Sequence, residues 1–251
     1  MAGNILSEDL LMKSLLTIYL AGSLRPVITR SRPLIEEVLG ADTHFVAGPA
    51  GLLARRLIAG EEADLFLSAD LGYARELADA LGLPSAPVPL VGNRLGLYVR
   101  PELATGDAVA TLSNPGLRIG TSTPGSDPCG DYTKAFLERI DVLHPSGDEP
   151  LVKRARALVG GPATPPLPAG SSAPRHFILD EGVCDAFIGY THNHVELTRD
   201  GRLVMEPLPG ELVDAVVYSI TALTPEGERA RSTFLCGPVH EALLEGGFEP
   251  V

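Results

Sequence analysis

Short apolar runs alternate with segments of helical spacing throughout the N-terminal third of the chain. The apolar runs cover residues 15–20, 43–47 and 64–68, and they lead into predicted helices over residues 26–39, 49–60 and 71–81. Parallel strands need a crossover connection, usually a helix, and the resulting sheet is covered on both faces. The alternation therefore predicts an α/β protein built from βαβ units.

Length and charge narrow the possible classes of protein. The chain has 251 residues, of which 45% are apolar, and this is enough for one large domain or for two lobes. Its formal net charge of -12 argues against nucleic acid and anionic membrane surfaces as partners. No run approaches the roughly 18 apolar residues of a membrane-spanning helix. The three cysteines, Cys129, Cys184 and Cys236, predict no disulfide framework.

The pattern changes between Pro84 and Val99, where two extended runs flank Gly92 and Asn93. We interpret this as a crossing into a second lobe, and residues 215–222 as the strand that returns. The predicted organisation is an N-terminal extension (1–15), a first lobe (16–92 plus 215–251) and a second lobe (93–214), with a ligand cleft between the lobes. Within the second lobe and the C-terminal segment we expect strands at 117–120, 185–190 and 203–205, and helices at 128–137, 149–158, 175–181, 225–235 and 239–244.

Residues 120–133, which read G-T-S-T-P-G-S-D-P-C-G-D-Y-T, combine a strand end with a helix start. Pro128 is expected to open the helix, with Asp127 as its N-cap. The first N–H groups of a helix lack intrahelical partners, and the helix dipole favours negative charge there. The stretch is therefore either a polar loop or one wall of an anion site.

Three such strand-to-helix turns occur, at Ser23, at Ala50 and Gly51, and at Cys129 and Gly130. Open α/β sheets bind ligands beyond the carboxyl ends of their strands, where these turns meet. The shared site would be rich in hydrogen-bond donors and poor in countercharge, which suits a small dianion. Hydrogen bonds to a charged group contribute about 1.5 to 3 kcal/mol each, so six or seven are compatible with a Kd near 1 μM.

Other residues invite alternative interpretations. Cys129 lies at a helix start, where thiol pKa values fall, but no histidine close in sequence could act as its base. His192 and His194 would share one face of a strand, but no further metal ligands cluster near them. Arg25 and Arg55 are either anion clamps or solvated and lobe-bridging side chains. Pocket lining by Cys129, rather than catalysis or metal binding, is the favoured interpretation.

Five motifs together resemble the molybdate/tungstate-binding solute-binding proteins of ABC transporters, the ModA type. They are A-G-S-L-R-P (21–26), A-G-P-A-G-L-L-A-R-R-L-I-A-G-E-E-A-D-L-F-L-S-A-D (47–70), G-N-R-L-G-L-Y-V-R-P (92–101), the 120–133 stretch and D-A-F-I-G-Y (185–190). The resemblance runs from about Leu16 to Phe248. It implies the type II periplasmic-binding-protein fold: two α/β lobes, each a mainly parallel sheet flanked by helices, joined by two crossing strands and closing on a tetrahedral oxyanion.

The resemblance also implies which residues bind the anion. Matched by motif, they are Ser23, Ala50, Gly51, Cys129, Gly130, Ser172 and Tyr190. Ala50 stands where many relatives have serine, so only backbone N–H groups serve there. The implied protein is a monomeric non-enzyme with no cofactor and no cation site, which delivers molybdate or tungstate to ABC permease subunits. Its implied location is periplasmic or at the cell surface.

Several alternatives stay open. The same fold could hold sulfate, phosphate or a carboxylate, and Asp127 or Asp131 could accept the proton of a protonated phosphate. The first residues show no secretory signal, so a cytoplasmic location and an intracellular anion sensor or storage protein are also considered. An enzyme with Cys129 as nucleophile is the alternative from a different class.

Overall fold

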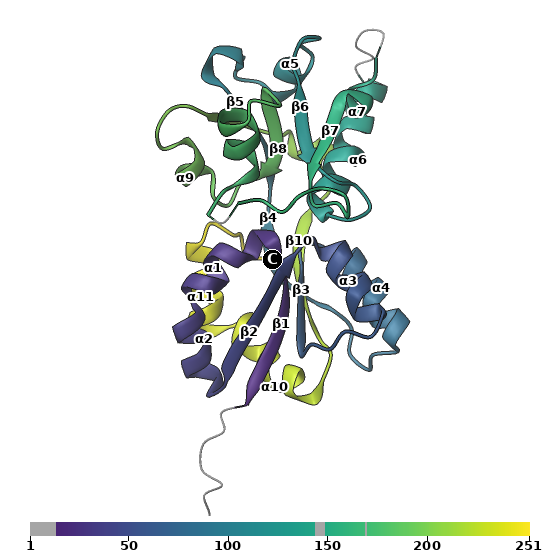
Figure 1. Cartoon of the computed structure of the whole chain (residues 1–251), viewed down its shortest axis with the longest axis vertical. Coiled ribbons are helices and arrows are strands. Elements are labelled where there is room, and N and C mark those ends of the chain that lie inside the picture. The colour runs from purple at the N-terminus through teal and green to yellow at the C-terminus, as the bar shows by residue number, and fades with distance from the viewer. Residues whose placement is uncertain (1–13, 144–148, 169) are drawn as a thin grey trace, which may run out of the picture.

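A computed structural model gives the fold of residues 14–143, 149–168 and 170–251, which form two sheets of five strands each, one in each lobe (Figure 1). The first sheet has the order β2-β1-β3-β10-β4, with β1 Leu15–Ala21, β2 Asp42–Gly48, β3 Leu65–Ser68, β4 Val88–Asn93 and β10 Val216–Ala222. The second has the order β7-β6-β8-β5-β9, with β5 Leu95–Val99, β6 Ile119–Ser122, β7 Ala155–Val159, β8 Ala186–Tyr190 and β9 Val204–Pro207.

Both sheets are mixed. Within the described residues each has two parallel pairings and two antiparallel ones. In the first lobe the parallel pairings, β1 with β2 and β3, come from the βαβ units that the sequence predicts. In the second lobe β6 pairs in parallel with β7 and β8. The antiparallel pairings involve β10 and β5, the strands on which the chain arrives from the other lobe. The two lobes are therefore joined by two crossings, β4 to β5 through Arg94 and the return into β10.

Helices cover the faces of both sheets (Figure 1). Those of the first lobe are η1 Gly22–Leu24, α1 Arg25–Arg30, α2 Arg32–Leu39, α3 Ala50–Ile58, α4 Gly72–Leu81, α10 Pro225–Leu235 and α11 Gly237–Glu245. Those of the second are η2 Pro101–Leu103, α5 Ala108–Leu112, α6 Pro128–Leu143, α7 Leu151–Arg154, α8 Ala173–Arg175, the π-helical turn η3 His176–Asp180, α9 His194–Thr198 and η4 Gly210–Leu212. Helix α3 packs on α4, and α2, α10 and α11 pack together.

Buried apolar side chains fill the space between sheets and helices. The larger core cluster includes Phe66, Phe136 and Tyr218, and a smaller one in the second lobe groups Tyr98, Phe177 and Phe187. Across residues 14–143, 149–168 and 170–251, every helix falls short of the length and apolarity that a bilayer crossing needs.

Three expectations about local structure are wrong. The single helix over 26–39 is two helices, broken at Ser31, because Pro33 has no N–H to continue the ladder of α1 and instead lies in the first turn of α2. The helix expected over 149–158 is confined to α7, residues 151–154, and its second half is β7, which pairs with β6. His192 and His194 are not in a strand, because β8 ends at Tyr190 and α9 begins at His194.

Candidate functional site

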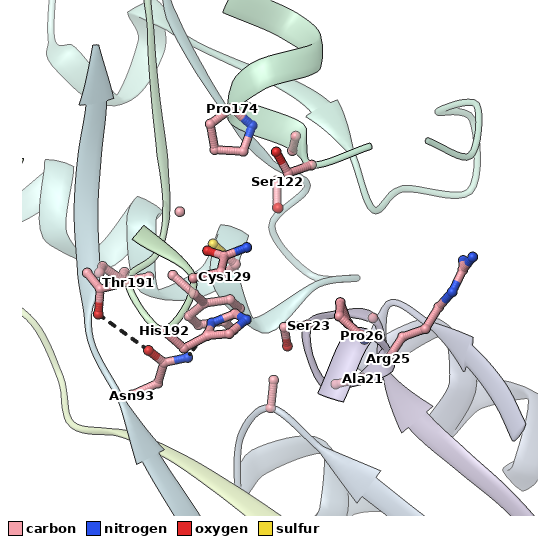
Figure 2. A pocket seen from close by; sticks show the side chains of 18 of the residues that line it. Ala21, Ser23, Arg25, Pro26, Asn93, Ser122, Cys129, Pro174, Thr191 and His192 are labelled. Atoms are coloured by element: carbon pink, nitrogen blue, oxygen red, sulfur yellow. Dashed lines mark hydrogen bonds between the residues drawn. The ribbon is translucent and has the colours of Figure 1, made fainter. Parts of the chain in front are cut away.

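A cleft between the two lobes is lined by residues from both of them (Figure 2). The turn after β1 brings Ser23 to it, and the start of α3 brings Ala50. From the second lobe come Cys129 at the start of α6, Ser172 before α8, and Tyr190 at the end of β8. Five of the seven residues expected from the sequence therefore meet at one cleft, although their role in binding stays a prediction.

Gly51 and Gly130 are not among the described residues that line the cleft. The Gly51 N–H donates to the Ser126 carbonyl (3.0 Å), and a Cβ at Gly51 would lie 2.8 Å from that oxygen. A Cβ at Gly130 would lie 2.5 Å from the carbonyl carbon of Thr123. Both glycines thus permit close backbone approach beside the cleft.

Ser23 takes part in a polar network that the sequence did not reveal. Its hydroxyl lies 2.8 Å from the Tyr218 hydroxyl, and the Asn93 amide nitrogen lies 3.4 Å from the same oxygen. Asn93 also contacts His192 Nδ1 at 3.1 Å and accepts a hydrogen bond from Thr191 (Figure 2). Asn93 and Tyr218 belong to the crossing strands β4 and β10, so the network joins the floor of the cleft to the connection between the lobes.

Two buried hydroxyl groups at the cleft have no hydrogen-bond partner among the described residues: those of Tyr190 and Ser172. The Tyr190 ring packs on Tyr218, with ring centroids 5.7 Å apart. Burial raises the pKa of Tyr190 well above its usual value, so its hydroxyl keeps its proton and is a donor. Buried hydroxyls normally find partners, and an unpartnered donor at a cleft indicates a ligand that accepts.

Cys129 is buried, and its thiol lies 3.8 Å from the Ile188 carbonyl. The expectation that the helix start lowers its pKa is wrong, because burial raises the pKa of this thiol and the Asp127 carboxylate beside it adds to the effect. A protonated, buried thiol is a poor nucleophile. The geometry therefore gives no support to the alternative of a Cys129-dependent enzyme.

The Cys129 N–H, which the sequence predicts as an anion donor, is already engaged. It donates to Asp127 Oδ1 at 3.0 Å, and the Gly130 and Asp131 N–H groups donate to the Asp127 carbonyl. Asp127 is thus the predicted N-cap of α6. Its side chain also lines the cleft, so a carboxylate stands where the first turn of this helix meets the ligand space.

His192 is neutral at ordinary pH. Burial lowers the pKa of its imidazole to about 4, and the ring stacks on Phe248 with centroids 4.5 Å apart. Within the parts of the chain that the structure describes, no three His, Cys, Asp or Glu side chains lie close enough together to hold a metal ion. The neighbouring His194 is exposed and contacts the Thr191 carbonyl.

The arginines near the cleft differ in their partners. Arg55 donates to the Gly125 carbonyl (3.0 Å) and to the Ser126 hydroxyl (3.1 Å), so it bridges the lobes. Arg94 and Arg175 line the cleft but are paired with Glu249 and Asp200. Arg25 extends away from the polar network around Asn93 (Figure 2). Ion pairing thus occupies Arg94 and Arg175, whereas Ser23, Ser172 and Tyr190 offer uncharged hydroxyl groups at the same cleft.

Comparison with known sequences gives a consistent set of relatives. The family model described as bacterial extracellular solute-binding protein matches residues 16–235. An uncharacterized protein of Pasteurella multocida is 34% identical over 222 residues, which cover 87% of this chain and 91% of that protein. The molybdate-binding protein ModA of Escherichia coli is 28% identical over 179 residues, which cover 63% of this chain and 67% of that protein.

Comparison with solved structures concerns the fold alone, because sequence identities are low. The periplasmic molybdate-binding protein of Azotobacter vinelandii superposes with a TM-score of 0.69 at 16% identity, covering 93% of this chain and 98% of that one. The sulfate-binding protein SubI from Mycobacterium tuberculosis gives a TM-score of 0.68 at 15% identity, covering 95% and 87%. Proteins named for two different oxyanions thus share this architecture.

Proposed function

This chain belongs to the bacterial extracellular solute-binding proteins, and from that premise we propose that it captures molybdate or tungstate in the interlobe cleft and delivers it to the permease subunits of an ABC importer. Its two-lobe α/β architecture is that of the type II periplasmic binding proteins. The proposed place of action is the periplasm or the cell surface. The observation that carries the proposal is the buried, unpartnered Tyr190 hydroxyl at the cleft.

The donor set supports an anion with oxygen acceptors on every side. Tyr190 and Ser172 offer hydroxyl donors from the second lobe, and Ser23 offers one from the first. The start of α3 adds the Ala50 N–H, because the Gly51 N–H is engaged by the Ser126 carbonyl, and the helix dipole favours an anion at this position. Neutral donors held in a closed cleft need no reorganisation when the anion arrives, so their hydrogen bonds count fully toward affinity.

The choice among oxyanions rests on the relatives and on cavity size. Two of the similar proteins are named for molybdate, and one is named for sulfate. Molybdate and tungstate are larger than sulfate, and donors placed for the larger anion stay unsatisfied around the smaller one. Ala50 lacks the hydroxyl of the serine that the resemblance implies at this position. The alanine leaves more space for the anion and removes one hydrogen-bond donor from the first-lobe side of the cleft.

A thermal-shift panel tests the proposal. We would add molybdate, tungstate, sulfate, phosphate and chromate, each at about 100 μM, near pH 6. A ligand at 100 times its Kd that binds only the folded state stabilises that state by about 2.7 kcal/mol and raises the melting temperature by several degrees. We expect this shift with molybdate and tungstate alone. A shift with sulfate or phosphate alone would replace the proposed ligand, and no shift with any oxyanion would refute the proposal.

A further inference from the structure

A carboxylate lines the cleft at the point where the proposed anion would meet helix α6. Asp127 Oδ1 accepts the Cys129 N–H at 3.0 Å, so this oxygen is committed to capping the helix. The other oxygen, Oδ2, faces Gly160, where a Cβ would lie only 2.5 Å from it. Gly160 has a φ of +80° and also lines the cleft. The absence of a side chain at Gly160 therefore leaves room for Asp127 between the helix and the loop that follows β7.

The surroundings of Asp127 do not neutralise its charge. Within the described residues no ion pair involves Asp127, and the nearby Arg55 donates to Gly125 and Ser126 instead. The negative charge of Asp131 on α6 disfavours the ionised form of Asp127. Hydrogen bonds from the Cys129 N–H and the Ser122 hydroxyl favour that ionised form. Burial outweighs these hydrogen bonds and raises the pKa of Asp127 to about 6.

The hydroxyl groups that strands β8 and β10 bring near Asp127 are uncharged. The hydroxyls of Tyr190 on β8 and Tyr218 on β10 are close enough for the Asp127 charge to raise their pKa values further. The thiol of Cys129 and the imidazole of His192 are neutral as well, because burial disfavours the charged form of each. Among these groups around Asp127, all within the described residues, a dianion would meet one negative carboxylate and no cation, although Arg25 lines the same cleft.

We propose that Asp127 contacts the bound anion and shares one proton with it, so that capture of a fully ionised oxyanion takes one proton from solvent. This inference rests on the proposed function. The proton is added to Oδ2, whose O–H then donates to an anion oxygen, while Oδ1 keeps the Cys129 N–H. No other covalent bond changes. The unpartnered Tyr190 hydroxyl supplies the second, independent sign that an acceptor occupies the space beside Asp127.

Proton uptake has a measurable consequence. Above the pKa of Asp127 in the empty protein, the protonated form becomes rarer, and affinity for a dianion falls by a factor of ten for each pH unit. We would titrate the full chain with sodium molybdate by calorimetry at about pH 6, 7 and 8, in two buffers of different ionisation enthalpy. Because about half of Asp127 is protonated at pH 6 and about one hundredth at pH 8, the expected Kd rises by about 50-fold between these pH values, with about one proton taken up per anion at pH 8.

Two variants isolate the carboxyl group. Asp127→Asn keeps an oxygen to accept the Cys129 N–H and offers the anion a permanent N–H donor. Its molybdate Kd is expected to vary less than about threefold over the same pH range and to be at least about tenfold tighter than wild type near pH 8. Asp131→Asn is the matched control on the same helix. Asp131 accepts from Tyr73 and from the Gly125 N–H, and does not line the cleft among the described residues, so the pH slope is expected to persist.

The outcomes separate this inference from the proposed function. Tight molybdate binding with a Kd that is flat from pH 6 to pH 8, and with no proton uptake, overturns the role of Asp127 and leaves the proposed function standing. Loss of the pH slope in Asp131→Asn but not in Asp127→Asn overturns it as well. Absence of binding by wild type and by a folded Asp127→Asn, with every oxyanion and at every pH, overturns the proposed function and the inference together.

Discussion

Three tyrosine side chains near the cleft differ in how their hydroxyl groups are satisfied. Tyr218 shares hydrogen bonds with Ser23 and Asn93, and Tyr98 donates to the Tyr190 carbonyl at 2.7 Å. Tyr190 has no partner among the described residues. A buried donor left unsatisfied costs free energy in the empty protein, and a bound acceptor would recover that cost. Tyr190 is therefore the residue whose hydroxyl most directly tests for a ligand.

Tyr190→Phe is expected to weaken molybdate binding by about 1.5 to 3 kcal/mol, roughly 10- to 150-fold in Kd, because a hydrogen bond to a charged acceptor is lost. The ligand-free variant should be as stable as wild type or more stable, since no existing hydrogen bond is removed. Tyr98→Phe is the control, with a loss of about 1 kcal/mol in the free energy of unfolding. An unchanged Kd for Tyr190→Phe in calorimetry would place this hydroxyl outside the contacts to the anion.

Asp127 is expected to make the stability of the ligand-free protein depend on pH. Its pKa is raised from 3.8 to about 6, so between these values the folded state binds more protons than the unfolded state, and stability falls as pH rises. Relative to Asp127→Asn, the free energy of unfolding of wild type should fall by about 1 to 1.5 kcal/mol between about pH 5 and pH 7.5. Urea unfolding of both proteins measures it. If the difference in the free energy of unfolding between wild type and Asp127→Asn stays constant across this range, the folded protein does not disfavour the ionised form of Asp127.

Sequence reasoning predicted which residues at the ends of elements line the cleft, although their role in binding stays a prediction. Ser23, Ala50 and Cys129 follow strands, and this position alone brings them to the cleft edge of their sheets. Tyr218 was missed because it lies inside β10, where a shift of one residue in register turns a side chain to the other face of the sheet. Asn93 ends β4, and its part in the network depends on contacts with Tyr218, Thr191 and His192 that only the structure shows. The occupation of the Cys129 N–H by Asp127 also required the structure, because an N-cap and an anion compete for the same donor.

At the scale of elements, the start of α6 depends on close packing against the loop that precedes it. The ladder of this helix begins with N–H groups that donate to the Asp127 carbonyl, and Gly130 lies against the backbone at Thr123 and Pro124. A side chain at Gly130 would overlap backbone atoms, which cannot move aside as a flexible side chain can. Gly130 therefore positions the helix start, and the direct binding role that its motif implied stays a prediction.

Gly130→Ala is expected to destabilise the protein by about 1 to 3 kcal/mol or more, because the new Cβ would force the loop away from α6. Molybdate binding should weaken as well, since the loop and the helix start both line the cleft. Gly116→Ala is the matched control in the same lobe, where the nearest atom to a new Cβ is 3.6 Å away. Thermal or urea unfolding measures both variants. Equal stability of the two would contradict the packing argument.

The misassigned elements show where the spacing of apolar residues does not determine the secondary structure by itself. Residues 151–159 contain apolar side chains at spacings that fit either a helix or a strand, and pairing of Ile119 with Ala155 decides in favour of β7. Such pairing is a tertiary interaction that a single sequence does not display. The break between α1 and α2 had a local signal in Pro33, which apolar periodicity alone overlooked. Apart from this break, the strands and helices in the N-terminal third were predictable because the apolar residues of each follow the spacing of its own secondary structure.

At the scale of the whole molecule, hydrogen bonds between the lobes gather on the side of α3 and α4. Arg55 on α3 donates to Gly125 and Ser126, and the Gly51 N–H donates to the Ser126 carbonyl. Tyr73 on α4 donates to Asp131 Oδ2 at 2.8 Å. These contacts join the helix pair of the first lobe to the start of α6 in the second. They exist only while the lobes stay close, so they favour the closed arrangement over an open one.

Arg55→Ala combined with Tyr73→Phe is therefore expected to shift the ligand-free protein toward open forms. Three side-chain hydrogen bonds are lost, each contributing about 0.5 to 1.5 kcal/mol, and molybdate Kd should rise by about tenfold or more because the competent closed state becomes rarer. The radius of gyration from X-ray scattering should increase without ligand and return to the wild-type value at saturating molybdate. Arg56→Ala is the matched control, because Arg56 bonds to Glu61 and Tyr19 within the first lobe. A double variant with wild-type radius and Kd would mean that the crossing strands alone, through the Asn93 network, set the closed state.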